Sequence, residues 1–183
     1  MAGHARSTGV HRAVLTCIVL TLAGTLRAEE PFDYFRNSWS IIGLKDYARG
    51  TRITPQNELL VTGADSNDIT VKIRFGRELT PLSPAQVKTL QEGWLPVVLL
   101  TAQDGSVRYE FTLWSTPLPS VKDWHAAFDG PSDGENFLNW IRAKVTNGGG
   151  TPAEAKLKVG SGGPSDSQFG DFTWSLAPGQ SAE

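Results

Sequence analysis

Residues 136–159 read NFLNWIRAKVTNGGGTPAEAKLKV and decide the fold of this chain. On either side of the glycines, side chains alternate with a period of two, which is typical of a β-strand with one buried face and one wet face. Asn147 and the three glycines tolerate positive φ, and Pro152 sets the exit of the turn. The stretch therefore predicts a strand, a glycine-rich connection and a second strand. The positions that share the apolar faces are Phe137, Asn139, Ile141, Ala143 and Val145, then Ala153, Ala155, Leu157 and Val159.

Length and composition indicate one globular domain. A chain of 183 residues, of which 39% are hydrophobic and 20% charged, is long enough to bury a sizeable core. The net charge is −2 and no run of Lys and Arg occurs, which argues against nucleic acid as the main partner. The 19 Gly and 11 Pro predict many turns, as in an all-β chain with short strands.

The N-terminus is predicted to be a signal peptide, residues 1–28. An apolar segment, residues 13–26, follows a basic start and is too short for a comfortable membrane span. Cleavage after Ala28 is expected, and an uncleaved N-terminal anchor is the alternative. The signal implies export to the periplasm or the extracellular space of a bacterium, with no membrane association after cleavage. The basic residues of the start are His4, Arg6, His11 and Arg12.

The mature chain, residues 29–183, is predicted to be a single β-sandwich domain without cysteine. Cys17 is the chain's single cysteine and lies inside the signal, so packing rather than disulfides must stabilise the domain. The clearest hairpin spans residues 94–114, where two strand-like runs flank Asp104-Gly105, a dipeptide favoured in type I′ turns. Shorter strands are expected at residues 57–62 and 68–75, as a hairpin or a corner between sheets.

Three further segments complete the prediction. Residues 43–54 are expected to form an irregular loop, and Ser83-Pro84 is expected to begin a short helix that Gly93 ends. A last strand is predicted at residues 169–176. The turn after it, residues 177–180, normally leads into another strand, yet only three residues follow. Two interpretations stand: the sandwich lacks its last strand or strands, or the chain is the N-terminal part of a longer protein, which we favour.

No catalytic constellation is recognisable. The 19 acidic residues lie mostly in turns or on outward strand positions, and no spacing selects the pair that a glycosidase needs. His125 is the single histidine outside the signal, and no nucleophile elbow accompanies it. Residues 65–68 resemble part of a calcium loop but lack its spacing and distal Glu. We therefore predict no catalytic residue, no metal site and no cofactor.

Tryptophan is the remaining signal, because six are present. Aromatic faces stack on sugar rings, and large aromatics also fill sandwich cores and domain interfaces. Trp114 and Trp140 share faces with charged residues, and Trp124 lies in a long loop, residues 116–134. These three are the candidates for carbohydrate-binding or interdomain positions. Trp39, Trp94 and Trp174 are expected in the core.

Several phrases of the sequence resemble one family. They are residues 37–39, 43–47, 50–52, 93–96, 141–147 and 176–179, with the strand-turn-strand phrase VTNxGxxPA among them. Together they look like the N-terminal β-sandwich of secreted bacterial proteins that carry a six-hairpin, (α/α)6-barrel glycosidase domain. The resemblance covers residues 32–183. It implies an antiparallel β-sandwich of the supersandwich or galactose-mutarotase-like type, with the catalytic carboxylates in a barrel that this chain does not contain.

The expected function follows from that resemblance. The chain would be the non-catalytic N-terminal domain of an exported glycoside hydrolase-like protein, packing on the C-terminal (α/α)6 domain and shaping its sugar cleft. The main alternative is an autonomous carbohydrate- or surface-binding module that uses exposed tryptophans. A third is a structural or adhesive sandwich without ligand. A groove with coplanar exposed Trp and nearby polar groups would favour the binding module, and a flat apolar patch would favour the interdomain role.

Overall fold

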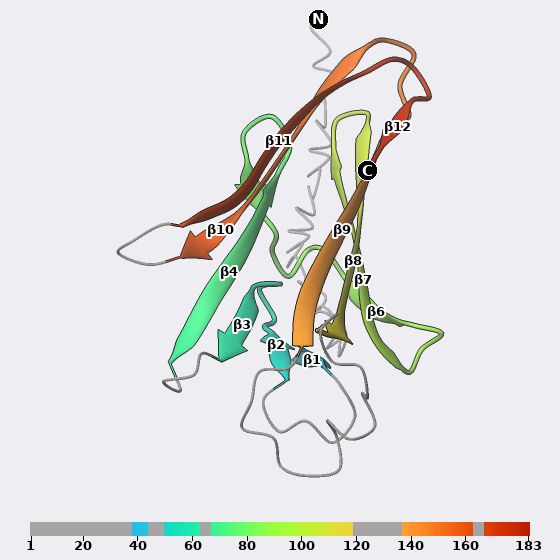
Figure 1. Cartoon of the computed structure of the whole chain (residues 1–183). Coiled ribbons are helices and arrows are strands. Elements are labelled where there is room, and N and C mark those ends of the chain that lie inside the picture. Colours follow the sequence, from blue (N-terminus) through green and yellow to red (C-terminus); the bar gives the residue numbers. More distant parts are fainter. Residues whose placement is uncertain (1–37, 44–49, 63–66, 119–136, 163–166) are drawn as a thin grey trace, which may run out of the picture. The chain divides into compact units, whose positions relative to one another are not determined.

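The computed structural model describes residues 38–43, 50–62, 67–118, 137–162 and 167–183 (Figure 1). The chain divides into two compact units, Met1–Pro31 and Phe32–Glu183, and every described residue lies in the second. Its strands form two antiparallel sheets that pack together, and no helix occurs among the described residues. The predicted all-β antiparallel sandwich is confirmed.

The two sheets differ in size. The larger has the order β1-β2-β3-β4-β10-β11, with β5 also paired to β4, and the smaller has the order β12-β9-β8-β7-β6. The strands of the larger sheet are β1 (Ser40–Ile42), β2 (Thr51–Ile53), β3 (Leu59–Thr62), β4 (Asp68–Phe75), β5 (Thr80–Pro81), β10 (Ala153–Gly162) and β11 (Gln168–Leu176). Those of the smaller are β6 (Lys88–Gln91), β7 (Leu95–Asp104), β8 (Val107–Pro117), β9 (Phe137–Asn147) and β12 (Ser181–Ala182).

The stretch that decides the fold forms β9 and β10, as its alternation predicts, but the two strands do not pair with each other. β9 pairs with β8 in the smaller sheet, whereas β10 pairs with β4 and β11 in the larger. The glycine-rich connection therefore carries the chain from one sheet to the other. The pattern of residues 136–159 predicts both strands. The sheet to which each strand belongs depends on its partner strands, which lie elsewhere in the chain.

The core lies between the sheets and follows the predicted alternation. Tyr109, Phe111 and Leu113 point inward from β8 and are fully buried, and Ile73 and Leu157 face them from the larger sheet. The rings of Phe75 and Tyr109 meet edge to face, with centroids 5.4 Å apart and planes at 62°. Such aromatic contacts add to the burial of apolar area that stabilises the sandwich.

The β7–β8 hairpin is present, but its turn differs from the prediction. Asp104 pairs with Val107, so Gly105 and Ser106 are the two central residues. Only Gly105 has positive φ, at 58°. A positive φ at the first central position alone characterises a type II′ turn, so the expected type I′ turn centred on Asp104-Gly105 is wrong. Asp104 instead accepts a hydrogen bond from the backbone N–H of Arg77 at 2.8 Å.

The predicted helix after Ser83 is also wrong. Ser83 and Gln86 form half of the capping contacts of a helix start, because Ser83 N donates to Gln86 Oε1 at 2.8 Å. Gln86 N donates to the backbone carbonyl of Ser83 at 3.0 Å, which closes a turn. However, Asn57 Nδ2 donates to the carbonyls of both residues, at 2.7 and 2.8 Å, and β6 begins at Lys88. Because Asn57 caps these carbonyls and β6 pairs with β7, the chain forms a single turn here and does not continue as a helix.

Two shorter segments also depart from the prediction. Residues 51–53 form β2 inside the expected loop and pair with both β1 and β3. The turn after β11 does lead into a strand, because Ser181 and Ala182 form β12 on β9. Both strands are too short to show a period of two, which is why no pattern predicted them.

Candidate functional site: an aromatic groove at a sheet edge

Trp114 and Trp140 are direct neighbours across β8 and β9. Their rings are nearly parallel, with centroids 6.0 Å apart and planes at 13°. Trp140 is 44% exposed, and its indole Nε1 donates a hydrogen bond to Thr116 Oγ1 at 2.7 Å. Because this donor is already satisfied inside the protein, the ring surface is the part of Trp140 that remains open to contacts from outside.

Two of the other tryptophans contradict the prediction that they lie in the core. Trp39 and Trp94 were expected in the core, but they are 55% and 70% exposed. Trp94 directly follows Glu92 and Gly93, whose positive φ values mark a turn, so its side chain starts outside the packed sheet. Trp174 is partly buried against the core. Trp124 and His125 lie outside the described residues.

A groove of about 470 Å³ begins at the Trp114–Trp140 pair and reaches the larger sheet. A second pair of nearly parallel rings lines it there, Phe172 and Trp174 of β11, with centroids 5.7 Å apart and planes at 9°. The remaining lining residues are Ile141, Arg142, Ala143, Leu157 and Glu183. The groove thus joins aromatic residues that are separated by up to about sixty positions in sequence, as the register of three strands dictates.

The groove exists because one sheet edge is short of a partner. β12 pairs only with Val145 and Thr146, so β9 from Leu138 to Lys144 has no strand beside its outer edge within the described part of the chain. Phe172 has the same parity as the buried Leu176 and so belongs to the inward face of β11, yet it is 47% exposed. Core-facing aromatic surface is therefore left in contact with solvent at this edge.

Charged and polar groups border the apolar lining. Arg142 Nε lies 3.6 Å from Glu183 Oε1, and both side chains are more than half exposed. An exposed ion pair contributes little to stability. Either group can therefore give up this contact for a hydrogen bond to a ligand at a small cost in stability. The groove combines flat aromatic faces with a hydrogen-bonding donor and acceptor.

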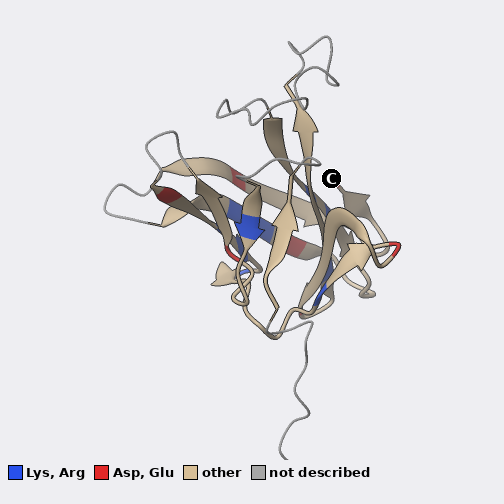
Figure 2. Cartoon of the chain, turned by 90° about the horizontal axis from the view of Figure 1, so that it is seen from below, with Lys and Arg blue, Asp and Glu red and all other residues tan. Residues whose placement is uncertain are grey.

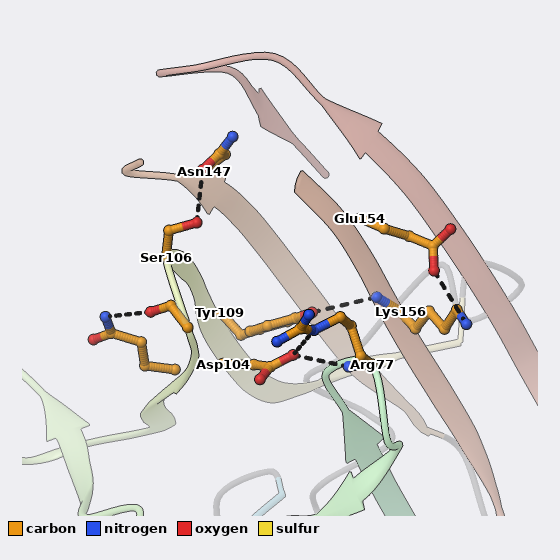
Figure 3. A network of polar contacts seen from close by, with 9 residues as sticks. Arg77, Asp104, Ser106, Tyr109, Asn147, Glu154 and Lys156 are labelled. Atoms are coloured by element: carbon orange, nitrogen blue, oxygen red, sulfur yellow. Dashed lines mark hydrogen bonds and ion pairs between the residues drawn. The ribbon is translucent and has the colours of Figure 1, made fainter. Parts of the chain in front are cut away.

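Polar contacts link the two sheets (Figure 3). Tyr109 is buried, and its hydroxyl oxygen accepts a hydrogen bond from the backbone N–H of Lys156 in β10 at 3.3 Å. Burial raises the pKa of the Tyr109 phenol above its usual value. Arg77 contacts Asp104 through its backbone N–H and through Nε, the latter at 3.7 Å. These contacts join the β4–β5 turn to the end of β7.

Asn147 is the most connected of the buried polar residues. Its Nδ2 donates to the carbonyls of Thr151 at 2.8 Å and Leu176 at 3.1 Å, and its Oδ1 accepts from Ser106 Oγ at 3.1 Å. It therefore ties the β7–β8 turn, the glycine-rich connection and the end of β11 together. The residue was recognised in the sequence as a turn former, whereas its anchoring role depends on contacts across the sandwich.

Lys88 is a buried lysine whose Nζ donates to the carbonyl of Thr54 at 3.1 Å. Desolvation by burial lowers the pKa of its ammonium. Its partner is the backbone carbonyl of the residue that follows β2, so the contact links β6 of the smaller sheet to the end of a strand in the larger one.

The described ranges offer neither a metal site nor a membrane-spanning helix. Within them, no three His, Cys, Asp or Glu side chains gather in a way that would hold a metal ion. The same residues include no helix with the length and apolar character needed to cross a membrane.

No protein-family model matches this chain, and neither a curated protein nor a solved structure matches it. The groove itself therefore supports the functional proposal. Sequence reasoning selected Trp114 and Trp140 from their charged neighbours, but it missed Phe172 and the Arg142–Glu183 pair. Phe172 lies on a face that alternation assigns to the core, and only the open edge exposes it.

Proposed function

We propose that this chain is a non-catalytic β-sandwich domain that binds carbohydrate through the aromatic groove. The observation that supports the proposal is the pair of parallel indoles, Trp114 and Trp140, facing a groove that also holds Arg142 and Glu183. Sugar rings stack their C–H faces on aromatic rings, and their hydroxyls need donors and acceptors nearby. The groove offers both within one hollow.

Binding to a panel of neutral and acidic polysaccharides by affinity electrophoresis tests this proposal. Trp140→Ala and Trp114→Ala should each abolish the retardation that the wild-type domain shows on its preferred glycan. Trp94→Ala is the matched control, because Trp94 is exposed and lies outside the groove lining. Equal loss of retardation in all three variants, or no retardation on any glycan, would contradict carbohydrate binding.

A second candidate is the interdomain role, in which the groove packs on a glycosidase barrel of the (α/α)6 type. The exposure of Phe172, a core-facing residue, favours it, because interfaces between domains bury such surface. The reading frame downstream of Glu183 tests it directly. Several hundred residues of paired amphipathic helices would support the interdomain role, and a stop codon at that point would exclude it.

Export is part of both proposals and rests on the N-terminal residues 1–28. Expression in a bacterial host, followed by N-terminal sequencing of the periplasmic protein, should give a chain that begins at Glu29. A cytoplasmic chain that keeps Met1 would contradict export.

A further inference from the structure

A second hollow lies on the outer face of the larger sheet, away from the residues of the aromatic groove. It has a volume of about 280 Å³, and β4, β10 and the start of β11 line it. Three cations contribute to its lining, Lys72, Arg74 and Lys158. The remaining lining residues are Glu78, Leu79, Gly160, Ser161, Ser167 and Gln168. The hollow and the aromatic groove share no lining residue.

The register of β4 and β10 places like charges opposite each other. Arg74 is the direct cross-strand partner of Lys158, and Lys72 is the partner of Gly160. Directly opposed side chains in an antiparallel sheet lie about 5 Å apart, so two cations there destabilise the pair. The chain as a whole carries a net charge of −2, so a general excess of basic residues does not account for the arrangement. Figure 2 marks Lys and Arg in blue and Asp and Glu in red along the strands.

Two of these cations form no ion pair, although the Asp171 carboxylate faces Lys158 across β10 and β11 and offsets part of its charge. Lys72 Nζ pairs with Glu58 Oε1 at 3.1 Å. Asp171, the β11 neighbour of Lys158, accepts a hydrogen bond from Gln168 Nε2 at 3.1 Å. Arg74 and Lys158 form no ion pair with any described carboxylate, and the Glu78 side chain lines the hollow without an ion pair to either.

Backbone irregularities shape the hollow at the same place. The pairing of β10 with β11 shifts register between Val159 and Gly160, which is a β-bulge. Gly160 has no side chain, and a Cβ there would lie 3.1 Å from the Ser167 carbonyl. Leu79, another of the lining residues, has a φ of 49°. Bulges and left-handed residues often accompany binding sites, because they redirect neighbouring side chains at some cost in stability.

We propose that this hollow binds an oxyanion, that is a carboxylate, sulfate or phosphate group, between Arg74 and Lys158. The anion would relieve the repulsion between the two cations and accept charge-assisted hydrogen bonds from both. Gln168 adds an amide at the rim. The oxyanion is either free in solution or carried on an acidic polysaccharide, since both present the same chemistry to the site.

Isothermal titration of the purified domain tests the proposal with four probes: sodium sulfate, sodium phosphate, an oligogalacturonate and its methyl ester. Arg74→Gln and Lys158→Gln should each weaken anion binding about tenfold or more, the effect of removing a charge-assisted hydrogen bond. Arg108→Gln is the control with the same change in net charge, because Arg108 lies on β8 in the other sheet and pairs with Glu110. The control should bind as the wild type does.

The probes also separate the two sources of the anion. Binding of sulfate or phosphate without binding of oligogalacturonate would assign the site to free anions. Tighter binding of oligogalacturonate than of its uncharged methyl ester would assign it to acidic polysaccharide. Absence of binding for every anion, or equal weakening in Arg108→Gln, would overturn the proposal.

Thermal unfolding gives a second readout that does not depend on finding the right ligand. Without anion, Arg74→Gln should unfold at a higher temperature than the wild type, because it removes the repulsion. Added sulfate should raise the melting temperature of the wild type and of Arg108→Gln by more than that of Arg74→Gln, since sulfate also stabilises folded proteins in general. A lower melting temperature for the variant would overturn the proposal. Trp140→Ala should leave anion binding unchanged, so failure of the carbohydrate groove and failure of this site are distinguishable.

Discussion

Asn147 Nδ2 donates a hydrogen bond to the backbone carbonyl of Leu176 at 3.1 Å and thereby connects the end of β9 in one sheet to the end of β11 in the other. The same amide group holds Thr151 O, so one buried side chain fixes where the chain leaves the smaller sheet and where it returns. Asn147→Ala would leave both carbonyls unsatisfied, and we expect a loss of about 3 kcal/mol in the free energy of unfolding. Urea denaturation measures it.

Ser106→Ala is the matched control for that variant. It removes a single hydrogen bond, from Ser106 Oγ to Asn147 Oδ1, and should lower the free energy of unfolding by about 1 kcal/mol. An Asn147→Ala variant no less stable than Ser106→Ala would show that water replaces the lost amide and that the anchor is not required.

The unpaired edge of β9 predicts an alternating pattern of hydrogen exchange. Asp104 and Val107 close a two-residue turn, so their backbone groups point at each other, and alternation along β8 then directs the amide of Arg142 toward Thr112. The amides of Ile141 and Ala143 consequently point to the outer edge. They should exchange on the order of tenfold or more faster than those of Arg142 and Lys144, as measured by NMR.

Uniform protection along residues 139–144 would contradict this prediction. It would mean that a further segment, from this chain or another, pairs with β9 in solution. Residues 109 and 111, at the centre of the same sheet, serve as internal references, since both of their strand edges are paired.

Gly76 is expected to be intolerant of substitution for two reasons at once. Its φ is 79°, and a Cβ would lie 2.9 Å from Asp104 Oδ2. Gly76→Ala should therefore cost about 2 kcal/mol or more and disturb the contact between Asp104 and Arg77. Gly179→Ala is the control, because Gly179 has a φ of 73° with no atom near the new Cβ. It should cost about 1 kcal/mol, and an equal loss in both variants would show that the close contact does not matter.

Lys88 predicts a pH dependence of stability in the alkaline range. Burial lowers the pKa of its ammonium in the folded state, so between that pKa and the unfolded value of 10.5 the unfolded chain binds more protons. Stability contributed by Lys88 therefore increases as pH rises through this window. The free energy of unfolding of the wild type minus that of Lys88→Met should grow with pH, measured by urea denaturation from neutral pH to about pH 10. A constant difference would contradict the lowered pKa.

Sequence alternation predicted the long strands because each buries one face. Residues 136–159, 107–113 and 68–75 carry enough consecutive inward positions for the period of two to be read directly. The type II′ turn was misassigned by one residue because Asp104-Gly105 and Gly105-Ser106 both suit a hairpin, and pairing of β7 with β8 selects between them. The helix after Ser83 failed for the same reason, since Asn57 and β7 supply competing hydrogen bonds from distant parts of the chain.

By itself, the sequence determined the fold class, the long strands and two of the four aromatic residues of the groove, because these follow from local alternation of apolar and polar side chains. Only the tertiary structure decided that β9 and β10 belong to different sheets, that Phe172 meets solvent, and that Arg74 faces Lys158. The physical reason is that a strand's pattern specifies which face is buried, whereas strand partners, register and free edges depend on hydrogen bonds between residues far apart in the chain.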